Sequence, residues 1–216
     1  MSVVRVGVGG AVGSGKTALV ERMTTKLVAG GWSPGIVAND IFTQEDALIL
    51  RRALHGVVDA ERIVGVETGA CPHSAVREDP TANLAAIAAL TARFPDIDLV
   101  LIESGGDNLT LTFSPLLADF SIYVLDTAAG DKMPRKQGPG MIQADLLVVN
   151  KVDLAPHVGA DLSVLDSDAR AVRPGPILYT DCRSDTGVDA VVEWLVDAVA
   201  VTRGGSREAA LGYGHV

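Results

Sequence analysis

Cysteine and aromatic residues are scarce in this chain. Its 216 residues include two cysteines, Cys71 and Cys182, which are too few and too far apart for a disulfide framework. We therefore expect a reducing compartment, the cytoplasm. Aromatic residues make up 4% of the chain, so Val, Leu, Ile and Ala have to fill the interior.

The chain also lacks a long hydrophobic segment and a run of basic residues. No apolar stretch is long enough to cross a membrane, and no secretory signal is recognisable. The formal net charge is −9, and Lys and Arg are not clustered, which argues against nucleic acid as the main partner. We therefore expect neither a membrane nor a nucleic acid as a partner.

What the chain does have is a regular alternation of expected strands and helices. Strands are expected at residues 3–9, 34–39, 63–67, 98–103, 120–126, 145–150 and 176–179. Helices are expected at residues 16–28, 44–54, 81–94 and 188–202. The alternation predicts an α/β fold with a doubly wound, mostly parallel sheet covered on both faces. We expect one domain over residues 1–203 and a disordered tail over 204–216.

A glycine-rich loop between the first expected strand and helix is typical of phosphate-binding loops. It reads GAVGSGKT over residues 10–17, and without the flanking strand and helix it would be an ordinary turn. Glycines let backbone N–H groups point at phosphate oxygens, and the helix N-terminus adds partial positive charge. Lys16 would reach the β- and γ-phosphates and act in catalysis, while the Thr17 hydroxyl would bind Mg²⁺. The predicted nucleotide ligands here are Gly10, Gly13, Ser14, Gly15, Lys16 and Thr17.

A second motif predicts which base the nucleotide carries. Asn150, Lys151 and Asp153 end and follow an apolar run, in the pattern N-K-x-D. An Asp carboxylate there can accept two hydrogens from guanine N1 and N2, a pair that adenine does not offer. A helix cap of the Asn/Asp type is the alternative. Cys182, after the last expected strand, lies where a final base-contacting loop would fall. The phosphate loop and the N-K-x-D motif together predict a P-loop GTPase.

Two acidic residues end expected strands beside the phosphate loop. Glu103 closes the strand at 98–103 and precedes Ser-Gly-Gly-Asp at 104–107, a segment that could sense the γ-phosphate. A carboxylate at this point can hold Mg²⁺ or polarise the attacking water, so Glu103 is a candidate for both roles. Asp40 is a candidate for the same roles, although an Asx turn would give the same pattern. No Arg or Gln is placed to orient water, so we expect slow hydrolysis by the isolated chain.

Cys71 and His73 flank Pro72 and form a pair of metal-binding side chains. Their spacing places both side chains on one side of an extended segment, a geometry that Pro72 favours. Two ligands are too few for a stable site, and a second copy of the pair from another subunit would complete an S₂N₂ set. Planar coordination would suit Ni²⁺ and tetrahedral coordination Zn²⁺. On spacing alone, a structural cysteine beside an incidental histidine is the simpler interpretation.

The order of these motifs closely resembles the UreG family of urease accessory proteins, which are nickel-metallochaperone GTPases. The most specific blocks are Glu-Thr-Gly-Ala-Cys-Pro-His at 67–73 and Glu-Ser-Gly-Gly-Asp-Asn at 103–108. The phosphate loop precedes them, and Asn-Lys-Val-Asp at 150–153 follows them, in the order of the family. The resemblance covers residues 4–154 and continues more weakly through the last expected helix.

The resemblance implies a GTPase of the class that dimerises around its nucleotide. In that family, the motif that contains Cys71 and His73 holds Ni²⁺ between two subunits. GTP with Mg²⁺ favours the metal-loaded homodimer, and hydrolysis releases nickel towards apo-urease. The implied partners are apo-urease and the other urease accessory proteins. Glu67, a further candidate magnesium ligand, would link the nucleotide site to the metal loop.

Three alternatives stay open on the sequence. One is a GTPase that inserts metal into another enzyme, as in the hydrogenase nickel-insertion family, although that family has a different metal block. Another is a small-molecule kinase with the same phosphate loop, against which the guanine motif argues. The third is a scaffold that binds GTP and hydrolyses it too slowly to matter.

Overall fold

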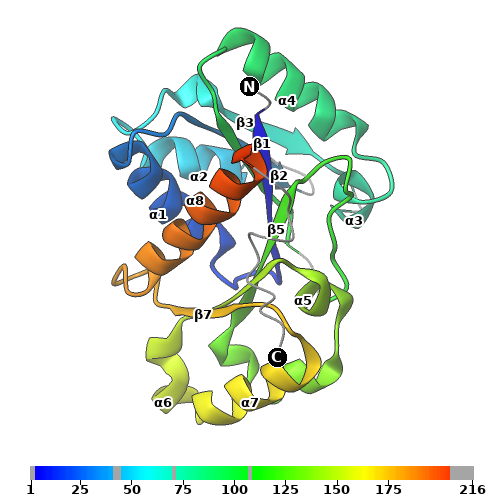
Figure 1. Cartoon of the computed structure of the whole chain (residues 1–216), viewed down its shortest axis with the longest axis vertical. Coiled ribbons are helices and arrows are strands. Elements are labelled where there is room, and N and C mark those ends of the chain that lie inside the picture. Colours follow the sequence, from blue (N-terminus) through cyan, green and yellow to red (C-terminus); the bar gives the residue numbers. More distant parts are fainter. Residues whose placement is uncertain (1–2, 41–44, 70–71, 107–108, 205–216) are drawn as a thin grey trace.

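A computed structural model of the chain describes residues 3–40, 45–69, 72–106 and 109–204. Its centre is a seven-stranded sheet with the strand order β3-β2-β4-β1-β5-β6-β7 (Figure 1). All neighbouring strands run parallel. The strands are β1 (Val4–Gly10), β2 (Pro34–Asp40), β3 (Ile63–Glu67), β4 (Leu99–Glu103), β5 (Phe120–Asp126), β6 (Leu146–Asn150) and β7 (Ile177–Thr180). The predicted α/β class with a parallel, doubly wound sheet is confirmed.

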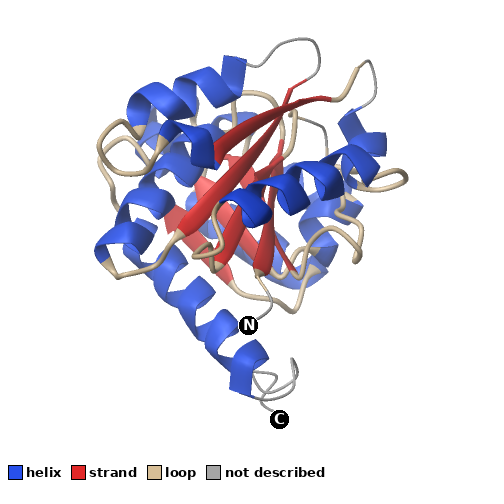
Figure 2. Cartoon of the chain, turned by 90° about the horizontal axis from the view of Figure 1, so that it is seen from above, coloured by secondary structure: helices blue, strands red, loops and turns tan. Residues whose placement is uncertain are grey.

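Helices cover both faces of this sheet (Figure 2). They are α1 (Lys16–Ala29), α2 (Glu45–Ala53), α3 (Pro72–Val76), α4 (Thr81–Arg93), α5 (Pro139–Gln143), α6 (Ala155–Val158), α7 (Leu162–Val172) and α8 (Val188–Gly204). Buried side chains of α1, α2 and α8 share one core with one face of the sheet. On the opposite face, α3 and α4 pack near β2 and β4, and α5 and α7 pack near β5 and β6. The sheet is therefore the middle of three layers.

The central strand β1 has different side chains on its two faces. Val4, Val6 and Val8 are buried in the core beneath α1 and α8. Gly7 lies on the other face, where an added Cβ would come within 2.6 Å of the Phe113 ring. The absence of a side chain there lets the segment after β4 pack directly on the strand. This packing helps to hold the strand from which the phosphate loop departs.

All the expected strands and helices are present, with bounds that differ by one or two residues. The expectations missed α3, α5, α6 and α7. Helix α7 had a readable signal, because the Asp161 carboxylate accepts hydrogen bonds from the N–H groups of Ser163 and Val164 and so caps its start. Helices α3, α5 and α6 have four or five residues each, which is too short for a helical period to show.

The last helix, α8, continues to Gly204. From residue 205 onward, the tail that we expected to be disordered lies outside the described residues. No helix in the described part of the chain is long and apolar enough to cross a membrane.

Candidate functional site

Residues 10–17 join β1 to α1 at the carboxyl edge of the sheet, where parallel sheets bind ligands. The loop has positive φ at Gly10, Gly13 and Gly15, with values of 148°, 76° and 95°. A Cβ at Gly10 would collide with the Val124 carbonyl, and one at Gly15 would collide with the Asn150 amide. Glycine at these two positions is therefore required both by the backbone angle and by the close approach of β5 and β6.

The two side chains predicted to bind phosphate and magnesium have partners inside the chain. Lys16 is buried, and its Nζ donates a hydrogen bond to the Ala11 carbonyl at 3.0 Å. Thr17 Oγ1 donates a hydrogen bond to Glu103 Oε1 at 2.6 Å. This places Glu103 at the phosphate loop, as the sequence predicted. The Thr17 oxygen can bind Mg²⁺ through a lone pair while its O–H donates to Glu103.

Glu103 has the environment of a metal-binding or proton-accepting carboxylate. Its side chain is fully buried, and this burial raises the pKa of the carboxyl to about 7, against the smaller lowering effect of the Thr17 hydroxyl. Within the described part of the chain, its second oxygen, Oε2, is buried without a hydrogen-bond partner. A buried carboxylate oxygen left unsatisfied is costly, and a divalent cation is a suitable partner for it. The Thr17 hydroxyl and the Glu103 carboxylate therefore fit a magnesium site.

Two further carboxylates lie near Glu103. Asp40 ends β2, and its Oδ2 accepts a hydrogen bond from the Glu45 N–H at 3.2 Å. Asp46, in the first turn of α2, was not predicted. Burial and the neighbouring Asp40 charge raise the pKa of Asp46, while Lys16 lowers it. From sequence, an acidic residue at this point is indistinguishable from one that complements the helix dipole.

Magnesium at this edge would need ligands from the nucleotide as well. Among the described residues, no group of three His, Cys, Asp or Glu side chains is arranged to hold a metal ion. Mg²⁺ typically takes one or two protein carboxylates and completes its shell with phosphate oxygens and water. Asp40 and Glu103 therefore remain candidate ligands that depend on bound nucleotide.

The segment after β4 contacts the phosphate loop. The Ser104 N–H donates to the Val8 carbonyl at 3.0 Å. At Gly106, where φ is +80°, a Cβ would lie 2.8 Å from Val12 Cγ2 and 3.5 Å from Lys16 Nζ. The segment predicted to sense the γ-phosphate therefore begins next to the phosphate loop. Its last residue, Asp107, lies outside the described residues.

Asn150 of the predicted base motif connects three parts of the site. Its Nδ2 donates to the Ser14 carbonyl at 3.0 Å. Its Oδ1 accepts hydrogen bonds from Thr180 Oγ1 at 3.0 Å and from the Cys182 N–H at 3.2 Å. Cys182 takes part through its backbone, because its thiol is buried in the core and burial raises the pKa of that thiol to about 11. Asn150 therefore braces the phosphate loop against the loop that follows β7.

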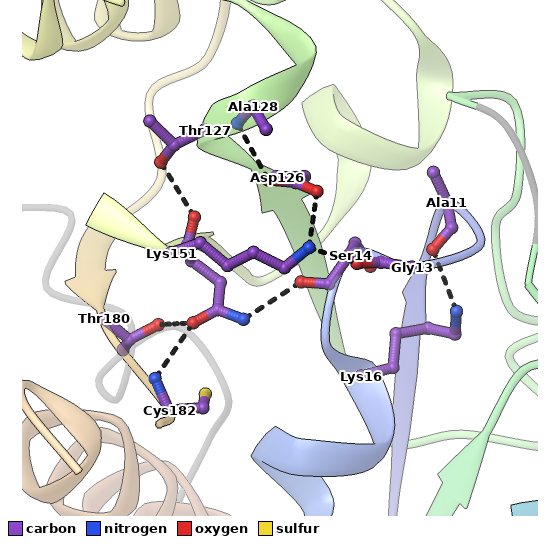
Figure 3. A network of polar contacts seen from close by, with 11 residues as sticks. Ala11, Gly13, Ser14, Lys16, Asp126, Thr127, Ala128, Lys151, Thr180 and Cys182 are labelled. Atoms are coloured by element: carbon purple, nitrogen blue, oxygen red, sulfur yellow. Dashed lines mark hydrogen bonds and ion pairs between the residues drawn. The ribbon is translucent and has the colours of Figure 1, made fainter. Parts of the chain in front are cut away.

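Lys151 extends over the phosphate loop. Its Nζ donates to the Gly13 carbonyl at 2.5 Å and forms an ion pair with Asp126 Oδ2 at 2.8 Å (Figure 3). Asp126 ends β5, and its other oxygen accepts a hydrogen bond from the Ala128 N–H at 2.8 Å. Asp126 was not predicted as a site residue, because an Asp at a strand end is common and its partner follows another strand, β6.

A pocket of about 270 Å³ lies next to Asn150 and Lys151. Asp153 is exposed and lines this pocket, together with Gly15, Ala18, Lys151 and Cys182. The pocket is continuous with the phosphate loop through Gly15. The structure thus brings Asp153 and the loop after β7 together where the sequence predicted the base.

The segment predicted to bind metal, residues 71–73, differs from its expected geometry in its described part. We expected Cys71, Pro72 and His73 to be extended, which is wrong for the described part, because Pro72 begins helix α3 and His73 lies within it. Proline is well suited to a first helical position, where its missing N–H costs nothing. His73 Nε2 lies 2.9 Å from Thr110 Oγ1. Cys71 lies outside the described residues, so the structure does not test the pair.

Glu67 ends the edge strand β3, where it is exposed and in register with Asp40 of β2. Strand β2 separates it from β4 and Glu103. Its assignment as a magnesium ligand remains a prediction. Taken together, a glycine loop between strand and helix, a buried lysine and an adjoining pocket define a nucleotide-binding protein of the P-loop class.

Comparison with known proteins narrows this class. The profile of the family described as CobW/HypB/UreG, nucleotide-binding domain, matches residues 4–179. A urease accessory protein UreG from Edwardsiella ictaluri is 60% identical over 195 residues, which cover 90% of this chain and 93% of the relative. The chain therefore belongs to the CobW/HypB/UreG family and, within it, to the UreG urease accessory proteins.

Solved structures share the fold of this chain. The hydrogenase maturation factor HypB from Archaeoglobus fulgidus has a TM-score of 0.68 and 28% identity, covering 90% of this chain and 89% of that one. HypB from Helicobacter pylori, solved in complex with nickel, has a TM-score of 0.75 and covers 99% of this chain and 92% of that one. At 19% identity, the second likeness concerns the fold alone.

Proposed function

We propose that this chain is a cytoplasmic, GTP-hydrolysing nickel metallochaperone that carries Ni²⁺ in a homodimer and delivers it to apo-urease. The observation that carries the proposal is the 60% identity to a UreG protein across 90% of the chain. The assembled nucleotide site supports it. The lower identity of 28% to a hydrogenase maturation factor favours urease over hydrogenase as the recipient.

Guanine recognition rests on Asp153 and the pocket beside it. The exposed carboxylate can accept the N1 and N2 hydrogens of guanine, whereas adenine would leave it without a partner. Asn150 and Lys151 already contact the phosphate loop through Ser14 and Gly13. Base binding is therefore mechanically joined to phosphate binding, and the bound nucleotide would be GTP.

Phosphate binding and hydrolysis would depend on Lys16, Thr17 and Glu103. Lys16 Nζ would donate to the β- and γ-phosphates, and the Thr17 oxygen would bind Mg²⁺. Bound Mg²⁺ would supply neutralisation of the charge that develops on the phosphates. Glu103 would hold Mg²⁺ or polarise the attacking water. Asp40 would assist at the end of the adjacent strand.

Nickel transport rests on Cys71 and His73 of two copies. One chain supplies a thiolate and an imidazole, whereas a stable site needs about four ligands. A two-fold dimer doubles the pair without further residues. The contact between His73 Nε2 and Thr110 Oγ1 must open if that nitrogen binds metal, so metal binding requires a local rearrangement next to the segment that follows β4.

Light scattering tests the dimer and both ligands at once. Molecular mass would be measured for the full chain alone, with Mg²⁺ and a GTP analogue, with Ni²⁺, and with all three. Cys71→Ala should remain monomeric in the last state. His157→Ala, which removes an exposed histidine on α6, should dimerise like the unaltered chain. A dimer unaffected by Cys71→Ala, or no dimer at all, would refute the nickel site.

Activation of apo-urease tests the recipient. The nickel-loaded chain, with GTP and the other urease accessory proteins, should restore urease activity, and a non-hydrolysable GTP analogue should not. Equal activation with the analogue would favour the scaffold interpretation, because hydrolysis would then be dispensable.

A further inference from the structure

Two buried asparagines connect the phosphate-loop side of the sheet to helix α3. Asn39, on β2, donates a hydrogen bond from Nδ2 to the Glu103 carbonyl at 2.9 Å. Asn83, on α4, donates from Nδ2 to Asn39 Oδ1 at 2.8 Å and to the Ala75 carbonyl at 2.9 Å. Both asparagines are fully buried. Ala75 lies in α3, two residues after His73.

Each end of this hydrogen-bond chain lies at a proposed binding site. At one end, the Glu103 carboxylate holds the Thr17 hydroxyl of the phosphate loop at 2.6 Å. At the other end, α3 contains Pro72 and His73 of the proposed metal motif. The path from Thr17 through Glu103, Asn39 and Asn83 to Ala75 is continuous. In Figure 1, α3 and α4 lie next to each other at the β2 and β3 side of the molecule.

Packing alone does not explain an asparagine at position 83. Its neighbours on the same face of α4, Ile87 and Leu90, are apolar members of the core. Among the described residues, Asn83 Oδ1 is buried without a hydrogen-bond partner. A leucine of similar size would fill the space and remove this unsatisfied oxygen, but it would also take the amide donor away from Asn39 Oδ1 and from the Ala75 carbonyl. An amide here makes sense if the connection between Asn39 and Ala75 is itself used.

We propose that Asn39 and Asn83 are positioning residues that transmit the nucleotide state to α3 and so set the nickel affinity of His73 and Cys71. The proposal rests on the proposed function and adds the residues that regulate its metal site. Mg²⁺ that enters with the nucleotide would bind the Thr17 oxygen and the Glu103 carboxylate, whose Oε2 is buried without a partner in the described structure, and so shift the end of β4. The Glu103 carbonyl then moves Asn39 and Asn83, and Asn83 moves α3. Because coupling is reciprocal, nickel must tighten GTP binding by the same factor.

Calorimetry on the full chain measures this coupling. Nickel dissociation constants would be determined with and without Mg²⁺ and a non-hydrolysable GTP analogue, and their ratio is the coupling factor. Ratios between coupled sites are typically about 5 to 150. In Asn83→Leu, the ratio should fall to about 1, while the affinity for the analogue without nickel stays within about twofold. Thr91→Val is the matched control, because Thr91 lies on the same helix and bonds only within it in the described structure.

The outcomes separate the relay from the function on which it rests. Loss of coupling in Asn83→Leu but not in Thr91→Val supports the relay. Full coupling in Asn83→Leu overturns the relay and leaves the nickel function standing. No nickel binding, or no coupling, in the unaltered chain overturns the proposed function and the relay with it.

Hydrogen exchange on the unaltered chain does not depend on any variant folding. The peptide over residues 72–80 includes the Arg77 and Asp79 amides, which bond to the His73 and Ser74 carbonyls. The GTP analogue with Mg²⁺, without nickel, should change the exchange rate of this peptide. An unchanged rate would overturn the relay.

Discussion

Glu103→Gln should stabilise the nucleotide-free protein, and the gain should increase with pH. Glutamine keeps an oxygen that can accept the Thr17 hydrogen bond, which is 2.6 Å long in the unaltered chain, but it cannot ionise. Burial raises the pKa of Glu103 from 4.5 to about 7. The folded state therefore resists losing this proton, whereas the unfolded chain loses it readily. The unaltered chain is therefore most stable, as far as this group is concerned, below pH 4.5, where the carboxyl is protonated in both the folded and the unfolded state. This stability is lost as the pH rises through 7.

The size of the effect follows from the pKa shift. One pKa unit corresponds to about 1.4 kcal/mol, so a shift from 4.5 to about 7 costs the ionised folded state about 3 kcal/mol. Between pH 5 and pH 8, the stability advantage of Glu103→Gln should grow by about 2–3 kcal/mol. That is a large part of the 5–15 kcal/mol typical of whole domains.

Urea unfolding at several pH values between 5 and 8, without nucleotide or divalent cations, measures this advantage. Glu193→Gln on α8 is the matched control, because Glu193 is exposed and its substitution should leave the pH profile parallel to that of the unaltered chain. If the pH profile of Glu103→Gln is also parallel to that of the unaltered chain, the reasoning is refuted. The buried carboxyl would then not have the raised pKa that its burial predicts.

Three further substitutions test the nucleotide and metal sites. Asp126→Asn should weaken binding of a fluorescent GTP analogue about fivefold, because Lys151 loses an ion pair worth about 1 kcal/mol; an unchanged dissociation constant would contradict this role. Asp153→Asn should weaken GTP binding by at least about tenfold and improve xanthosine triphosphate binding, since an amide donates where the carboxylate only accepts; competition titration measures both, and an unaltered preference would argue against the base site. Thr110→Val should tighten nickel binding about fivefold by removing a partner of His73 worth about 1 kcal/mol, and calorimetry showing equal or weaker affinity would count against it.

The arrangement of residues at the carboxyl edge of the sheet was largely predictable because its signals are local. Positive φ at Gly13 and Gly15 is a property of the loop sequence itself, and the run of β-branched residues before it forms β1 as expected. Glu103 and Asn150 end buried strands, and the carboxyl ends of parallel strands share one edge. The residue types and their order were enough to bring them to one site.

Around Pro72, local sequence signals were not sufficient to predict the backbone conformation. Pro72 is compatible with an extended chain and with the first turn of a helix, and the two differ little in local energy. The hydrogen bonds from Asn83 to Ala75 and from the Ser114 N–H to the Val76 carbonyl hold the helical form. These partners come from other elements, so the pattern around Pro72 carried no trace of them.

The sequence by itself determined the α/β class, the phosphate loop, the base motif and the family, because each depends on residues close together in the chain. The tertiary structure decided which of these parts touch. Thr17 and Glu103 are 86 residues apart, Asn39 and Glu103 are 64 apart, and Asn39 and Asn83 are 44 apart. These contacts exist because β4 is inserted between β1 and β2 in the sheet. Strand order is settled by the packing of whole faces, so the connection from the phosphate loop to α3 became visible only in the folded chain.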